Sequence, residues 1–212
     1  MTIHNYLHST LNIVYEAFKD QIVFPSRETR NENSRNFEDT QISVVIDGSE
    51  QQCYVSETSM TEKNTYSGKK KKHTLTKMVV CSPRGHIYYL SPSYGGSRND
   101  MMVYDFPENH IHIKLDQDEA ICSDLGYRGL QNYHLNVIIP SNRKNMQADE
   151  EERECNKKSI RVMVENVIRR IKEWKICKEK IRFPTDDLNE LLTTHHKLWT
   201  ICSVLVNKYH KK

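Results

Sequence analysis

The chain has 212 residues, of which 37% are apolar and 28% charged, and its formal net charge is +3. This composition excludes a disordered or collagen-like chain, and the length is near the upper end of one ordinary domain. The mild positive charge permits a polyanionic partner without requiring one. No stretch approaches the roughly 18–20 consecutive apolar residues of a membrane span, and the N-terminus lacks the apolar centre of a secretion signal, so we expect neither.

The first forty residues are predicted to form one helix and a connection. Apolar side chains recur at helical spacing through residues 1–20, which indicates an amphipathic helix that packs on the rest of the chain. The polar stretch 28–40 has no sustained period and is predicted to be a surface connection. With residues 1–40 assigned in this way, residues 41–212 are expected to form the main domain.

Three strands are predicted in the first half of that domain. Residues 42–46 form a run dominated by β-branched residues, typical of a central strand buried on both faces, and Asp47 follows at its predicted C-terminal end. The runs 78–81 and 86–90 flank a four-residue turn and predict a β-hairpin.

Two further strands are predicted in the second half. The run 120–123 is followed by an acid, Asp124, and the run 137–139 is stopped by Pro140. The simplest assembly is a mixed five-stranded sheet flanked by helices, which is an α/β fold.

Two helices are predicted near the C-terminus. The densely charged stretch 142–158 is interpreted as a solvated loop or the exposed start of a helix. Apolar residues at helical spacing predict a long amphipathic helix over 159–175, with Ser159 as its N-terminal cap. A final helix is predicted over 187–208.

Three acids stand where they could hold a cation. Glu165 falls beside the border of the apolar stripe of the 159–175 helix, on the same side as Arg161 and Lys172. With Asp47 and Asp124 it provides carboxylate oxygens, which Mg²⁺ prefers together with water and phosphate ligands. Acids are mostly exposed surface residues, so the spacing alone leaves a purely structural role open for each of them.

Five blocks of the sequence follow one another in a characteristic order: VIDGSE at 45–50, YSGKKKKHTLTKMVV at 66–80, GHIYYLSPSYGGSRND at 85–100, SDLGYRG at 123–129 and NKKSIRVMVENVIRRIKEWKI at 156–176. These blocks resemble those of the DDE superfamily of transposase nucleases, specifically the Harbinger and related insertion-sequence branch. The resemblance spans about residues 12–208.

The resemblance implies a ribonuclease-H-like fold in which Asp47, Asp124 and Glu165 are catalytic and bind two divalent ions, Mg²⁺ or Mn²⁺. It implies a metal-dependent endonuclease and strand transferase of a cut-and-paste DNA transposon, which cleaves at transposon ends and joins 3′-OH ends to target DNA. The chain departs from the family pattern at Asn166, where a basic residue is common, and at Ser123, where alanine is common.

Asp100 is the rival for the second catalytic position, because it ends the Gly-Gly-Ser loop and is expected near the edge of the sheet. We prefer Asp124. Asp100 is expected instead to support the site as a turn residue whose side chain accepts backbone hydrogen bonds.

Basic residues near the predicted acids are expected to contact DNA phosphates. The set comprises Lys69, Lys70, Lys71, Lys72, Arg161, Arg169 and Lys172. A solvated hairpin tip and an ordinary exposed helix face are the alternative interpretations.

The expected partners are DNA, a second copy of the chain on DNA, and a separate Myb-like DNA-binding protein, since no recognition helix is evident before Asp47. The resemblance implies the nucleus in a eukaryotic host and the cytoplasm otherwise. Two alternatives are a domesticated, non-catalytic DNA- or protein-binding descendant and a general ribonuclease-H-type nuclease. Zinc is disfavoured, because the six scattered cysteines form no CxxC pair.

Overall fold

The computed structural model of the protein describes residues 3–55, 59–140, 148–182 and 187–209. The α-helices in these ranges are α1 (Ile3–Phe18), α2 (Arg27–Glu32), α3 (Ser59–Thr65), α4 (Asp100–Tyr104), α5 (Ala148–Ile171), α6 (Lys175–Lys178) and α7 (Leu188–Tyr209). The strands are β1 (Arg35–Phe37), β2 (Thr40–Gln52), β3 (Tyr66–Ser67), β4 (Lys72–Cys81), β5 (Ile87–Leu90), β6 (Tyr94–Gly95), β7 (Glu119–Cys122) and β8 (Val137–Ile138).

Strand β2 is the centre of a mixed sheet. It pairs antiparallel with β4 on one side and parallel with β7 on the other, and β8 continues the sheet in parallel beyond β7. Strands β3, β5 and β6 pair antiparallel with β4. The order β5–β4–β2–β7–β8 is that of a ribonuclease-H-like fold, so the predicted α/β class and its five main strands are confirmed.

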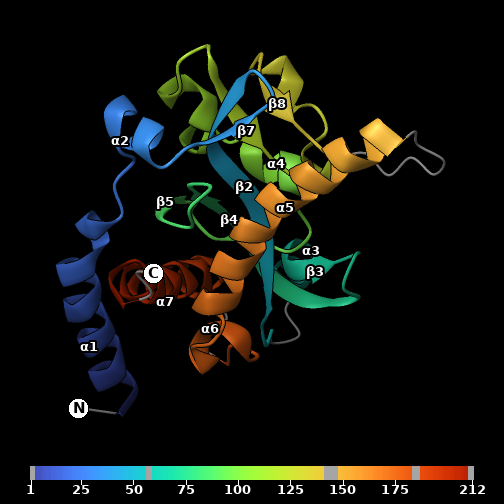
Figure 1. Cartoon of the computed structure of the whole chain (residues 1–212). Coiled ribbons are helices and arrows are strands. Elements are labelled where there is room, and N and C mark those ends of the chain that lie inside the picture. Colours follow the sequence, from blue (N-terminus) through green and yellow to red (C-terminus); the bar gives the residue numbers. More distant parts are fainter. Residues whose placement is uncertain (1–2, 56–58, 141–147, 183–186, 210–212) are drawn as a thin grey trace.

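Both faces of this sheet are buried. Alternate residues of β2 point to opposite sides, Val45 into a core shared with α5 and α7, and Val44 and Ile46 into a core shared with α4 and the segments that follow it. Figure 1 shows α5 crossing in front of β2. The prediction of a central strand buried on both faces is therefore confirmed.

Strand β2 continues past Asp47 to Gln52, so the prediction that this acid ends the strand is wrong. The apolar run in the sequence is shorter than the strand because the second half of β2 buries polar side chains. Gln51 is 2% exposed, and its amide donates hydrogen bonds to the carbonyl oxygens of Ile176 and Glu179. These partners satisfy the buried amide, which allows a polar residue in a central strand.

The segment 28–40, predicted as a surface connection, contains part of α2 and all of β1. Helix α2 is held by Arg30, which is 5% exposed and forms a bidentate ion pair with Glu119 at the start of β7. Strand β1 pairs with the beginning of β2 across a turn in which Glu38 has φ of 52°. A partner so distant in the sequence leaves no local periodic signal, which is why this prediction failed.

Helix α5 begins at Ala148, so Ser159 lies inside the helix and the predicted cap is wrong. Of the charged stretch 142–158, residues 142–147 lie outside the described residues and the remainder is helical. The helix continues through this charged stretch with Glu154 7% exposed and paired with Lys157 at 2.8 Å. An ion pair at this spacing supports helical structure without an apolar period.

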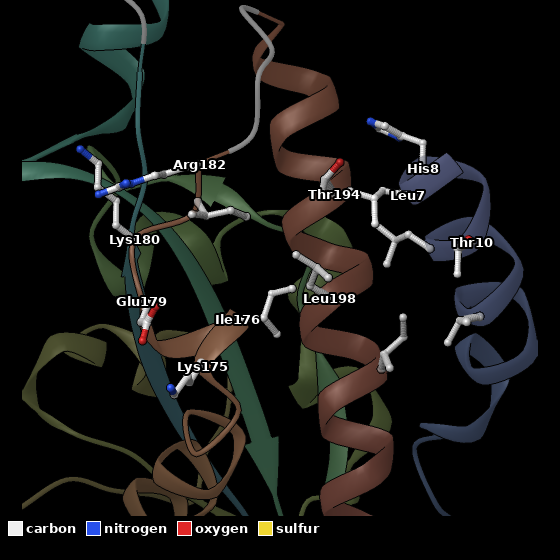
Figure 2. A pocket seen from close by; sticks show the side chains of 14 residues that line it. Leu7, His8, Thr10, Lys175, Ile176, Glu179, Lys180, Arg182, Thr194 and Leu198 are labelled. Carbon is white, nitrogen blue, oxygen red and sulfur yellow. The ribbon is translucent and has the colours of Figure 1, made fainter. Parts of the chain in front are cut away.

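Helix α1 packs against α7 at one side of the molecule (Figure 1). An apolar cavity of about 630 Å³ lies between α1, α7 and the segment 175–182. Leu7, Leu198 and Ile176 line it from these three segments (Figure 2). None of the predicted acids lines this cavity, so the chemistry must be sought elsewhere. None of the described helices has the length and apolar character needed to cross a membrane.

Candidate active site

The pairing of two parallel strands brings Asp47 and Asp124 to neighbouring positions. Val45 of β2 is paired with Cys122 of β7, and each acid follows two residues later in its own chain segment. Because side chains alternate along a strand, Asp47 points to the same side of the sheet as Val45, the side that α5 covers. Asp124 leaves β7 as the cap of the short turn η4 (Leu125–Tyr127), where its Oδ1 accepts a hydrogen bond of 2.8 Å from the backbone N–H of Gly126.

The electrostatics of Asp47 reflect this crowding. Burial first, and then the nearby charges of Asp124 and Asp100, raise the pKa of its carboxyl to about 7, while the N–H of Gly48 and the charge of Arg161 oppose the change. The Gly48 N–H donates to Oδ1 of Asp47 at 2.8 Å. A carboxylate in such surroundings is stabilised by a cation placed between it and the neighbouring acids.

Asp100 is part of the same acidic cluster. It is the first residue of α4, and its carboxylate lies between the backbones of Gly48 and Gly126: a Cβ at Gly48 would stand 2.2 Å from Oδ1, and one at Gly126 would stand 2.3 Å from Oδ2. Burial, followed by the charge of Asp124, raises its pKa. Within the described chain no hydrogen bond reaches this carboxylate, although the sequence predicted backbone donors for it.

Tyr127 lies in the block SDLGYRG, and the sequence did not predict it to be part of the site. Its ring is fully buried, and its hydroxyl has no hydrogen-bond partner among the described residues. A Cβ at Gly48 would lie 3.7 Å from this hydroxyl, and burial and then the charges of Asp100, Asp47 and Asp124 raise the pKa of Tyr127. A buried phenol without a partner beside three acids is an unsatisfied donor at the centre of the cluster.

Glu165 lies on α5, and its Oε1 is 2.8 Å from Nη2 of Arg161 one turn earlier. The structure therefore brings Asp47, Asp124 and Asp100 close enough for their charges to interact, and it holds Glu165 in an ion pair on the helix above. Over the residues that the structure describes, no three His, Cys, Asp or Glu side chains converge into a ready-made metal site, zinc included. The donor chemistry still suits Mg²⁺ or Mn²⁺, because carboxylate oxygens are their preferred protein ligands.

A small cavity of about 240 Å³ opens beside Asp124. Its walls include Leu125 and Pro140 on the sheet side, and Lys158 and Arg161 on α5. Burial raises the pKa of Asp47 and the charge of Arg161 opposes that rise, so the guanidinium that lines this cavity also influences Asp47. Lys158 was not among the residues predicted to bind DNA.

The four consecutive lysines are exposed at the tip of the β3–β4 hairpin and its start. The turn there places Lys71 in the left-handed region with φ of 55°. The charge of Lys69 lowers the pKa of Asp100, and that of Lys70 lowers the pKa of Lys172, so the tip lies on the same side of the molecule as the acids.

The other predicted DNA contacts on and after α5 differ in exposure. Lys172 is half-buried, its Nζ donates to the carbonyl oxygen of Glu50 at 2.9 Å, and burial is the main cause of its lowered pKa. Arg169 is exposed and pairs with Glu173 at 2.7 Å. The structure therefore leaves Arg169 more accessible to a ligand than Lys172.

A family model described as DDE superfamily endonuclease matches residues 46–207. Neither the curated proteins nor the solved structures that were searched gave a match. The matched region runs from the central strand to the last helix and contains Asp47, Asp124 and Glu165. Because it also covers most of the chain, the chain belongs to the DDE superfamily of endonucleases.

Proposed function

We propose that the protein is the catalytic part of a cut-and-paste DNA transposase, a metal-dependent endonuclease and strand transferase with Asp47, Asp124 and Glu165 as metal ligands. Family membership implies a DNA substrate. The observation that carries the proposal is that Asp47 and Asp124 each lie two residues beyond a paired position of two adjacent parallel strands, beneath the helix that carries Glu165. Acids from two adjacent strands and one covering helix can surround a reacting phosphate from different directions.

Two bound divalent ions, Mg²⁺ or Mn²⁺, would activate the attacking water and stabilise the leaving 3′ oxygen. The protein positions its carboxylates and excludes bulk water from one side of the site, because the sheet and α5 bury Asp47. Hydrolysis frees a transposon 3′-OH, which then attacks target DNA as the second nucleophile. Exposed cations, including Lys69 and Arg169, hold the phosphates on either side of the reacting bond.

A metal-dependent cleavage assay on supercoiled DNA tests the proposal. Asp47→Asn, Asp124→Asn and Glu165→Gln should each abolish Mn²⁺-dependent nicking while circular dichroism shows an unchanged fold, because each replaces a ligating charge with a near-isostere. Asp100→Asn should retain part of the activity. If Asp124→Asn cleaved like the wild type and Asp100→Asn were inactive, the second catalytic acid would be Asp100.

A second candidate is a domesticated DNA- or protein-binding descendant without catalysis. One observation favours it: Glu165 is engaged by Arg161 of its own helix. The two candidates differ in their response to metal. A catalytic site binds Mn²⁺ only in the folded state, so millimolar Mn²⁺ should raise the melting temperature of the wild type but not of the triple acid variant. An unchanged melting temperature in both proteins would favour the second candidate.

The wider assembly is part of the same proposal. We infer that residues 1–40 pack on a nuclease domain formed by residues 41–212, that copies of the chain act together on DNA, and that a Myb-like partner supplies sequence recognition. In a eukaryotic host the site of action would be the nucleus.

A further inference from the structure

The cavity beside Asp124 has two positively charged side chains in its wall. Lys158 and Arg161 are three positions apart on α5, so they face the same direction. Lys158 is exposed and forms no ion pair with any described residue. A recess with two cations in its wall has the charge and the size to accept an anionic group.

Arg161 has two competing partners. Its guanidinium is 2.8 Å from Glu165, and it lines the cavity together with Asp124. While this pair persists, the negative charge of Glu165 is neutralised by an arginine of its own helix. While the pair exists, the Glu165 carboxylate is not available to a metal ion, and the Arg161 guanidinium is not available to a phosphate.

The Arg161–Glu165 pair is easily exchanged. The two side chains are 28% and 43% exposed, and the pair has arginine on the N-terminal side, the less favourable orientation for an i, i+4 pair. Such pairs stabilise a helix by only about 0.2–0.5 kcal/mol. A phosphate gives arginine a bidentate partner of equal or greater strength.

We propose that this cavity is a phosphate-binding subsite for the DNA strand and that Arg161 exchanges Glu165 for a DNA phosphate. The exchange frees Glu165 to join Asp47 and Asp124 in binding metal. DNA binding thereby completes the metal site, and the acids do not gather fully before the substrate arrives. This inference rests on the proposed function, and it adds an order of events and a role for Lys158.

Competition for Glu165 is measured by a double-mutant cycle on Mn²⁺ affinity, with DNA absent. The four proteins are the wild type, Arg161→Gln, Glu165→Gln and the double variant, and binding is followed by electron paramagnetic resonance of free Mn²⁺. Arg161→Gln should raise Mn²⁺ affinity about twofold more in the wild-type background than in the Glu165→Gln background, which is the factor that corresponds to losing one such pair. The cycle removes the general effect of deleting a positive charge, because that effect is present in both backgrounds.

Helix α5 also provides a matched control. Arg169 and Glu173 form the same i, i+4 pair at 2.7 Å, but neither lines the cavity. In the absence of DNA, Arg169→Gln should change Mn²⁺ affinity by the same factor in the wild-type and the Glu165→Gln backgrounds, because its partner is Glu173 and not Glu165. An equal gain from Arg169→Gln and Arg161→Gln would overturn the exchange.

The phosphate subsite is tested on the same proteins by fluorescence anisotropy with a duplex oligonucleotide in EDTA. Arg161→Gln and Lys158→Gln should each make the log–log salt slope of affinity less steep by about 0.9, the value for one phosphate contact. Glu165→Gln should raise DNA affinity only when Arg161 is present. The proposal would be overturned if Arg161→Gln and Glu165→Gln had additive effects both on Mn²⁺ affinity and on DNA affinity.

The two proposals fail in distinguishable ways. A wild type that neither binds Mn²⁺ nor nicks DNA would refute the proposed function. A wild type that binds Mn²⁺ and nicks DNA, but whose cycles are additive, would refute only the exchange at Arg161.

Discussion

The carboxylate of Asp100 fills space that glycine leaves free at two positions. A Cβ at Gly48 would stand 2.2 Å from its Oδ1, whereas a Cβ at Gly68 would meet nothing within 4 Å. Gly48→Ala should therefore push Asp100 out of the cluster, lower the free energy of unfolding by about 1–3 kcal/mol as overpacking does, and weaken Mn²⁺ binding. Gly68→Ala is the control and should stay within about 0.5 kcal/mol of the wild type.

Urea unfolding and Mn²⁺ titration of these two glycine variants provide the measurements. Equal stability and equal Mn²⁺ affinity in Gly48→Ala and Gly68→Ala would mean that Asp100 can leave without consequence. In that case its place between the two backbones would be incidental to the site.

A lysine is buried in the core on the α7 side. Lys77 is fully buried, and its Nζ lies 3.2 Å from Oγ of Ser93 and 2.8 Å from Nδ1 of His196. Burial lowers the pKa of Lys77 well below its usual value, and burial followed by the charge of Lys77 lowers that of His196 to about 3. The folded protein thus holds an amine that the unfolded chain would protonate.

This lysine should make stability depend on pH in a known direction. Because the pKa of Lys77 is depressed in the folded state, the unfolded chain binds the extra proton at every pH between that lowered value and the ordinary value of 10.5. The contribution of Lys77 to stability therefore rises with pH, by about 1.4 kcal/mol per pH unit in this window. Relative to Lys77→Met, the wild type should gain stability as the pH rises toward the ordinary lysine value of 10.5 in urea titrations. Parallel pH profiles would show that Lys77 keeps its proton in the folded state.

Helix α2 is attached to β7 by one buried ion pair. Arg30 donates to Oε1 of Glu119 at 2.8 Å, and the exposed fractions of the two side chains are 6% and 0%. Arg30→Met should lower the free energy of unfolding by about 3–5 kcal/mol, because it leaves a buried charge without its partner. Removing the charge as well, in Arg30→Met with Glu119→Gln, should recover a large part of that loss.

The neighbouring arginine of α2 provides the control for this pair. Arg27 contacts Asp116 and Asp118 at 3.1 and 2.6 Å, but all three side chains are at least 45% exposed. Arg27→Met should change the free energy of unfolding by no more than about 1 kcal/mol. Equal losses at Arg27 and Arg30 in thermal or urea unfolding would contradict the difference that burial makes.

Elements with a strong period were predictable from the sequence, and elements held by distant polar contacts were not. The apolar stripe of α5 and the β-branched start of β2 follow from 3.6- and two-residue periods, as does the final helix α7. The second half of β2 and the helix α2 depend on Gln51 and Arg30, whose partners lie more than eighty positions away. The start of α5 was missed because charged residues paired within the helix carry no apolar signal.

The candidate site was partly predictable for a similar reason. Asp47 and Asp124 were predicted because each follows a strand that the sequence predicts, whereas the parallel pairing that makes them neighbours appears only in the structure. Asp100 and Tyr127 reach the candidate site on irregular segments that follow β6 and β7. These segments have no hydrophobic period from which their course could be predicted. The ion pair of Glu165 with Arg161 could have been anticipated from their spacing of four residues on a helix.

The whole molecule has a small net charge of +3, but cations gather where the acids are. Lys69, Lys70, Lys71 and Lys72 are exposed on that side. Their joint replacement by glutamine should lower DNA affinity almost equally for every duplex, because phosphates carry no sequence information. It should also flatten the salt dependence of binding by up to about 0.9 in log–log slope per lost phosphate contact.

A salt titration of affinity for a candidate terminal repeat and for scrambled DNA tests this expectation. The control replaces Lys175, Lys178 and Lys180, exposed lysines beside the apolar cavity, and should leave the slope nearly unchanged. A preference of more than about a hundredfold for the terminal repeat, or about 2.7 kcal/mol, would show that the chain contains a sequence-reading element.

The parallel pairing of β2 with β7 also bears on how the chain folds. The antiparallel partner of β2 is β4, which follows it closely in the sequence, whereas β7 arrives only after the hairpin, α4 and several turns. Contacts between distant segments are entropically slow to form, so we expect Asp47 and Asp124 to meet late, after most of the sheet has assembled. A ligand that requires both acids therefore cannot bind in the transition state of folding. Such a ligand would lengthen the lifetime of the folded protein without making the protein fold faster.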